Sequence, residues 1–85
     1  MLDFRIETFL SVCRTMNFTA AAEELHITQP AVSQHIRYLE KAYGCQLFLR
    51  DGKRISLTPA GEVLRRTMGS LQNDHQTILR RMQEA

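Results

Sequence analysis

The 85-residue sequence predicts a mainly helical fold, in which three short helices and a two-stranded hairpin are followed by one long helix. Three observations support this prediction. Apolar residues recur with helical spacing up to residue 43, interrupted by good capping residues. The spacing then changes to alternation on both sides of Asp51-Gly52, which is a strong turn signal. From residue 64 to residue 82, apolar residues and one histidine recur every three or four positions, which is a heptad pattern.

The first two helices are short and are separated by a capping residue. We expect Asp3 to cap the first helix, which continues to about Thr15. Asn17 is expected to cap the second helix, which ends near Leu25. The apolar stripe of the first helix consists of Ile6, Phe9, Leu10 and Cys13.

The third helix is predicted to start after Thr28, its cap, and to end at Gly44 in the left-handed conformation. Pro30 is tolerated because it lies in the first turn, where its missing N–H had no helical acceptor. One face is predicted to pack on the two earlier helices and consists of Val32, Ile36, Leu39 and Tyr43. A second, polar face consists of Pro30, Ser33, Gln34, Arg37 and Lys41.

The remainder of the chain is predicted to form a hairpin and a long helix. Strands at 47–50 and 54–57 flank the Asp51-Gly52 turn. Thr58 is expected to cap the last helix, with Pro59 at its first position and its end near residue 84. Three helices followed by a hairpin form a winged helix-turn-helix. We therefore divide the chain into a winged domain at 1–58, with its helix-turn-helix at about 18–37 and its wing at about 47–57, and a linker helix at 59–85.

The charge is concentrated in the middle of the chain. The whole sequence carries a formal charge of +2, whereas residues 29–66 hold seven cations against three acids, a local charge of +4. A local basic surface of this kind attracts the phosphate backbone of nucleic acid.

Several other classes of protein are not indicated. The start of the chain alternates apolar and charged residues, unlike a signal peptide, and the apolar runs are too short to span a membrane. Cys13 and Cys45 form no disulfide framework, which favours a reducing, cytoplasmic location. His26 and His35 lack ligand partners at metal spacing, so we expect neither a metal site nor a cofactor. The sequence has no phosphate loop or nucleophile with a nearby base, so we do not expect an enzyme.

The chain also resembles a known family. Residues 18–40 are FTAAAEELHITQPAVSQHIRYLE, residues 47–50 are LFLR and residues 57–61 are LTPAG. This combination resembles the N-terminal domain of LysR-type transcriptional regulators along essentially the whole chain. The resemblance implies a bacterial regulator that binds an interrupted palindrome in double-stranded DNA as a homodimer, with antiparallel linker helices. It also implies a C-terminal domain that senses a small-molecule co-inducer, and frequent tetramers. We interpret this sequence as ending before that domain.

The resemblance and the helix pattern together predict the DNA contacts. The third helix is expected to lie in the major groove and the wing on the minor groove or the backbone. Residue 34 is often Arg in relatives and is Gln34 here, which changes the base preference. The expected base-reading residues are Gln29, Pro30, Ser33, Gln34 and Arg37. The expected contacts with the backbone or minor groove come from Asn17, Thr19, Thr28, His35, Arg50, Lys53 and Arg54.

The long helix is predicted to form the dimer contact. Its heptad stripe continues past the point where so small a domain can cover it, so a second copy is expected to bury the remainder. The stripe consists of Leu64, Met68, Leu71, His75, Ile78 and Met82.

Several residues have a simpler interpretation. The amides and hydroxyl of the third helix can form an ordinary solvated face, and Arg37 can pair with Glu40 or Glu23. The wing cations can simply keep an edge strand soluble. For His35, contact with a phosphate and plain surface exposure are equally plausible. For His75, the favoured interpretation is a histidine tolerated in the dimer contact, and the alternative is a pH sensor.

Two other functions compete with duplex binding. One is a winged helix used for protein–protein assembly, and the other is a winged helix that binds RNA. Both would favour exposed aromatic side chains, which the sequence pattern does not predict. The polar face and the basic wing favour duplex DNA instead.

Overall fold

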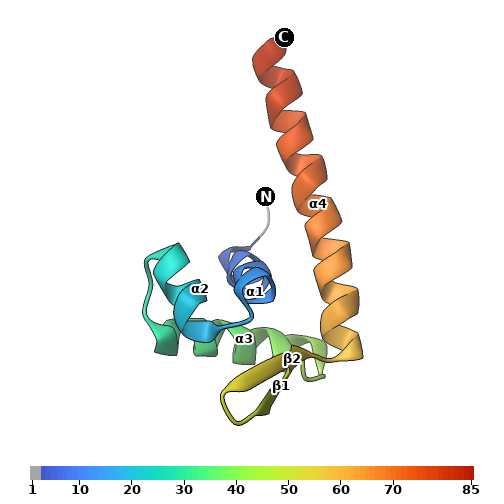
Figure 1. Cartoon of the computed structure of the whole chain (residues 1–85). Helices are drawn as coiled ribbons and strands as arrows, with labels where there is room; N and C mark the ends of the chain where they lie inside the picture. The colour runs from blue at the N-terminus through green and yellow to red at the C-terminus, as the bar shows by residue number, and fades with distance from the viewer. Residues whose placement is uncertain (1–2) are drawn as a thin grey trace.

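The computed structural model describes residues 3–85. Figure 1 shows α1, α2 and α3 packed together, the hairpin beside α3, and α4 projecting well beyond them. This projection gives the molecule extents of 50 × 26 × 19 Å. The fold is the mainly helical winged helix-turn-helix that the sequence predicts. In chain order the elements are α1 (Phe4–Thr15), α2 (Phe18–Leu25), α3 (Gln29–Tyr43), β1 (Phe48–Asp51), β2 (Arg54–Leu57) and α4 (Pro59–Glu84).

Each helix begins at the capping residue that the sequence indicates. The side chain of Asp3 accepts the N–H of Arg5 at 2.8 Å, and that of Asn17 accepts the N–H of Ala20 at 2.9 Å. Thr28 and Thr58 cap α3 and α4 in the same way, at 3.2 and 2.9 Å. These side chains satisfy N–H groups that have no acceptor inside the helix.

The core lies among the three short helices, the base of the hairpin and the start of α4. Phe9, Val12 and Val32 are fully buried. Phe48 joins the wing to this core, because its ring centroid lies 5.5 Å from that of Phe9 and 5.9 Å from that of Phe18. The wing is therefore anchored by aromatic packing as well as by its own strand pairing.

The hairpin turn is displaced by one residue from the prediction. The strands pair Phe48 with Leu57 and Asp51 with Arg54, so the loop is Gly52-Lys53 and not Asp51-Gly52. Gly52 takes the first loop position with φ of +62°, a conformation that glycine adopts without strain. This register turns Phe48 and Leu57 inward, and a shift by one residue would turn them outward.

The inward face of α3 is shorter than predicted. Val32, Ile36 and Leu39 are buried, but Tyr43 is 49% exposed. Tyr43 is the last residue of α3 before Gly44, which ends the helix with φ of +71° as expected. At this position the helix has run past the part of the core that would cover the ring.

A cluster of hydrogen bonds attaches α4 to the base of the wing. The hydroxyl of Thr58 donates to the carbonyl oxygen of Gln46 at 2.6 Å, and its N–H donates to the carbonyl oxygen of Leu47 at 3.0 Å. Gly61 lies against the same Leu47 carbonyl, where an added Cβ would be only 2.2 Å from the oxygen. The start of α4 is therefore fixed relative to the wing.

Candidate nucleic-acid interface

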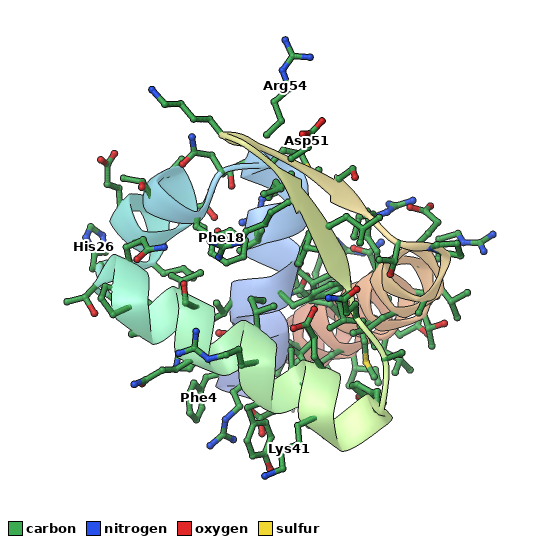
Figure 2. The ribbon with its side chains drawn as sticks, turned by 90° about the horizontal axis from the view of Figure 1, so that it is seen from below. Phe4, Phe18, His26, Lys41, Asp51 and Arg54 are labelled. Carbon is green, nitrogen blue, oxygen red and sulfur yellow. The ribbon has the colours of Figure 1, made fainter. Side chains whose placement is uncertain are left out.

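The exposed surface of α3 is a stripe of polar and cationic residues. Pro30, Gln34, Arg37 and Lys41 are all exposed and follow one another at helical spacing. Figure 2 shows α3 in front of α1 in this view, so the stripe is on the outer side of the helical core. Within residues 3–85, Arg37 belongs to none of the ion pairs, so its guanidinium is available to a ligand. This stripe retains four of the five residues of the predicted polar face.

Ser33 departs from the predicted face. Its side chain is turned toward the wing, and the residue is only 9% exposed. Nε2 of Gln29 donates a hydrogen bond of 3.1 Å to the hydroxyl oxygen of Ser33. Gln29 is half-buried. Gln29 keeps its Oε1 as an acceptor, because Nε2 makes this hydrogen bond.

Two neighbouring polar residues have contacts inside the domain. Nδ1 of His35 lies 2.8 Å from Oγ1 of Thr8 on α1, and the His35 ring packs edge-on against Phe4 at 5.0 Å. Burial, helped by the charge of Arg5, lowers the pKa of His35, which favours the neutral ring. The carboxylate of Glu40 accepts the N–H of Leu47 at 2.8 Å, so it supports the wing and does not pair with Arg37.

The wing presents cations beside α3. Arg50, Lys53 and Arg54 are all exposed. The guanidinium of Arg50 lies 4.5 Å from the centroid of the Phe18 ring, which orients it across the start of α2. Figure 2 shows Arg54 extending away from the body of the domain at the tip of the hairpin. A hollow of about 440 Å³ separates α3 from the wing, and Arg37 and Arg50 are among its lining residues.

A second hollow connects α2 to the wing. It has a volume of about 240 Å³ and brings Asn17 and Thr19 together with Arg50 and Lys53. Asn17 also caps α2 through its Oδ1, which leaves its amide nitrogen as a donor. Four residues that the sequence predicts to contact the DNA backbone or minor groove therefore line one surface depression.

Some aromatic rings are exposed, contrary to the sequence-based expectation. Phe4, Tyr38 and Tyr43 are each about half exposed. The guanidinium of Arg5 lies over the rings of Tyr38 and Phe4, at 3.9 and 4.8 Å from their centroids. These ring faces are therefore already partly covered, which limits their use as platforms for unpaired bases.

The long helix carries the predicted stripe, but its two ends differ. Leu64 is buried in the domain's own core and Met68 packs against that core. Farther along, Leu71, Ile78 and Met82 are exposed, whereas His75 is half-buried. Val63 and Leu79 are also exposed, although the heptad pattern does not include them. A mainly apolar hollow of about 520 Å³ lies between the end of α3 and the start of α4.

Other kinds of site find no support in the part of the chain that the structure describes. Across residues 3–85, no three His, Cys, Asp or Glu side chains are grouped so that they could hold a metal ion. None of the helices there is both long and apolar enough to cross a membrane.

Comparison with known proteins identifies the family. Residues 5–62 match the family described as bacterial regulatory helix-turn-helix proteins of the lysR family. The chain belongs to the LysR family. Among its relatives is the HTH-type transcriptional regulator HdfR of Yersinia enterocolitica, which is 54% identical over 59 residues. That match covers 69% of this chain but 20% of HdfR, so the chain spans about a fifth of this relative's length.

Solved LysR-family structures have the same fold. A transcriptional regulator of the LysR family from Eggerthella lenta is 64% identical, with a TM-score of 0.75 over 81% of this chain and 99% of that one. The BenM DNA-binding domain in complex with benA site 1 DNA is 27% identical, with a TM-score of 0.90 over 99% of this chain and 94% of that one. Vibrio fischeri DarR, also in complex with DNA, is 35% identical, with a TM-score of 0.84 over 99% of this chain and 29% of that one. The chain is therefore a LysR-type DNA-binding domain.

Proposed function

We propose that this domain binds double-stranded DNA in a sequence-specific manner, with α3 in the major groove and the wing on the adjacent backbone or minor groove. The observation that carries the proposal is the exposed stripe of Pro30, Gln34, Arg37 and Lys41, with a cationic wing beside it. A major groove about 12 Å wide admits one α-helix, and the flanking phosphates then face the elements beside that helix. The DNA complexes of BenM and DarR support the same kind of partner for this chain.

The base-reading part of the proposal rests on Arg37, Gln34 and Gln29. Arg can pair with guanine and Gln with adenine through the major groove, and a good contact of this kind discriminates by about 1–3 kcal/mol. Arg37→Ala and Gln29→Ala should therefore weaken binding to a duplex selected from a randomised pool more than binding to an unselected duplex. Arg80→Ala is the charge-matched control, because Arg80 is exposed near the far end of α4. Equal losses on both duplexes would refute base reading by these residues.

The wing part of the proposal predicts a change in salt dependence. Each phosphate contact contributes about 0.9 to the slope of log affinity against log salt concentration. Replacing Lys53 and Arg54 by Gln should therefore reduce that slope by up to about 1.8, if each cation meets one phosphate. Fluorescence anisotropy titrations at several salt concentrations provide the measurement. A slope equal to that of the wild type would place the wing away from DNA.

We also propose that the domain dimerises through α4. Leu71, Ile78 and Met82 are exposed on one side of a helix that extends beyond the domain, and pairing with a second copy would bury them. Two-fold symmetry would then present two recognition helices to a palindromic site. A protein with this function would act in the cytoplasm of a bacterial cell, where the chromosome lies.

Leu71→Asp tests the dimer. Leu71 is 47% exposed and lies beyond the domain's own core, so the variant should stay folded while placing a charge in the paired surface. Asn73→Asp adds the same charge at an exposed polar position of the same helix and is the matched control. Sedimentation at tens of micromolar, a range suited to weak association, should show dimers for the wild type and the control and monomers for Leu71→Asp. Monomeric wild type, or a dimeric Leu71→Asp variant, would contradict the proposal.

An assembly module remains a second candidate because of the exposed aromatic rings of Phe4, Tyr38 and Tyr43. Aromatic residues are enriched at protein interfaces. In this case the domain would show no salt-dependent affinity for duplex DNA. The titrations described above therefore distinguish the two functions.

A further inference from the structure

Arg5, at the start of α1, is held beside α3, the helix that we propose lies in the major groove. Its guanidinium carbon lies 3.9 Å from the centroid of the Tyr38 ring, and Tyr38 follows Arg37 on α3. The Phe4 ring lies on the same guanidinium at 4.8 Å, so two aromatic rings contact one cation. We call Arg5, Phe4 and Tyr38 the aromatic clamp.

The clamp is next to the exposed stripe of α3, on the side away from the wing. At 100° per residue, Tyr38 is adjacent on the helix surface to Gln34 and Lys41, which belong to that stripe. Ser33 and Glu40 mark the opposite side of the helix, where α3 faces the wing. Figure 2 shows Phe4 and Lys41 near one edge of the domain and Arg54 at the opposite edge.

We infer that Arg5 is a further phosphate-binding residue, which contacts the DNA backbone on the side of α3 opposite to the wing. This inference rests on the proposed DNA binding. A helix in the major groove has a phosphate strand on each side. The wing supplies cations on one side, and the clamp supplies a cation that is already positioned on the other.

The clamp explains how Arg5, although it lies on α1, can present its guanidinium to a phosphate beside α3. Stacking on Tyr38 restricts the guanidinium and leaves its edge, with the N–H donors, free to face a phosphate. Asp3 opposes this role, because its Oδ2 lies 3.3 Å from Nη1 of Arg5. A phosphate would compete with this exposed carboxylate for the same donor.

The first test is the salt dependence of Arg5→Gln. Loss of one phosphate contact should reduce the slope of log affinity against log salt by about 0.9. The ratio of wild-type to variant affinity should then be about 3.5 times larger at 50 mM than at 200 mM salt. The loss should be equal on selected and unselected duplexes, because phosphate contacts carry no sequence information. Arg5→Lys should retain the slope, since it retains the charge, and Arg80→Gln is the matched control.

Variants of two residues that contact Arg5, Tyr38 and Asp3, separate its positioning from folding. Tyr38→Phe keeps the ring and should leave affinity unchanged, whereas Tyr38→Leu should weaken binding to both duplexes. Asp3→Asn removes the competing charge but keeps a capping side chain, so it should strengthen binding. Thermal unfolding of each variant verifies that it is folded at the assay temperature.

The outcomes distinguish this inference from the proposal on which it depends. If the wild type binds duplex DNA and a folded Arg5→Gln variant has the wild-type slope, the inference is wrong and the proposed function stands. If Asp3→Asn weakens binding, the inference is likewise wrong. If the wild type does not bind duplex DNA, both are wrong.

Discussion

Replacing Gly61 by Ala should destabilise the domain, because the added methyl group has no space. Its Cβ would lie 2.2 Å from the carbonyl oxygen of Leu47 and 2.8 Å from Cδ2 of Leu57. Leu47 cannot move freely, since its carbonyl oxygen also accepts the N–H of Thr58. Overpacking lowers the free energy of unfolding by about 1–3 kcal/mol, and a clash with the backbone should place this variant near the upper end of that range. Ala is favoured over Gly in a helix by about 1 kcal/mol, so a net loss of about 2 kcal/mol remains.

Gly69→Ala is the matched control on the same helix. No heavy atom lies within 4 Å of a Cβ at this position, so only the helix propensity changes. For a domain of this size, 1 kcal/mol shifts the melting temperature by about 4–8 °C. Thermal unfolding followed by circular dichroism should therefore show a decrease of about 8–16 °C for Gly61→Ala and an increase of about 4–8 °C for Gly69→Ala. A Gly61→Ala variant that melts at or above the wild-type temperature would refute the packing argument.

Three further predictions concern the helical core. Burial raises the pKa of the Cys13 thiol to about 12, whereas Cys45 is exposed, so a thiol reagent at mildly alkaline pH should modify only Cys45 until the protein is unfolded. The hydrogen bond from Ser11, assisted by Arg14, lowers the pKa of Glu24 below its ordinary value of 4.5. Its contribution to stability is therefore complete above that value and is lost as the pH falls through the lowered pKa, so Glu24→Gln should make unfolding less sensitive to acid. Glu40→Ala should lower the free energy of unfolding by about 1–3 kcal/mol in denaturant titrations, because the buried N–H of residue 47 loses its acceptor, and Glu40→Gln should lower it less.

The sequence determined the helix boundaries because the signals that set them are local. Asp3, Asn17, Thr28 and Thr58 each accept an N–H two or three residues ahead, so the residues that form a cap are neighbours in the chain. Most residues of the exposed stripe of α3 could also be predicted from the sequence, because helical periodicity is a local property as well. Helical geometry alone places Pro30 and residues 34, 37 and 41 on the same side.

Tertiary contacts decided which side chains face the wing and the core. Ser33 belongs to the polar face by its spacing, yet it is buried on the side of α3 that faces the wing. The hairpin register depends on Phe48, whose ring packs against Phe9 and Phe18, so the loop lies one residue later than the local turn signal predicts.

Local signals in the sequence were sufficient to predict the helices and the wing, their order, and the side of α3 that carries polar groups. Three features depend instead on packing between elements: the position of Arg5 against Tyr38, the contact of Gly61 with the Leu47 carbonyl, and the burial of Ser33. The two groups of features differ in how far apart the interacting residues lie along the chain. Caps and helical periodicity depend on residues within a few positions of one another, whereas these contacts join groups on different elements and form only when those elements pack.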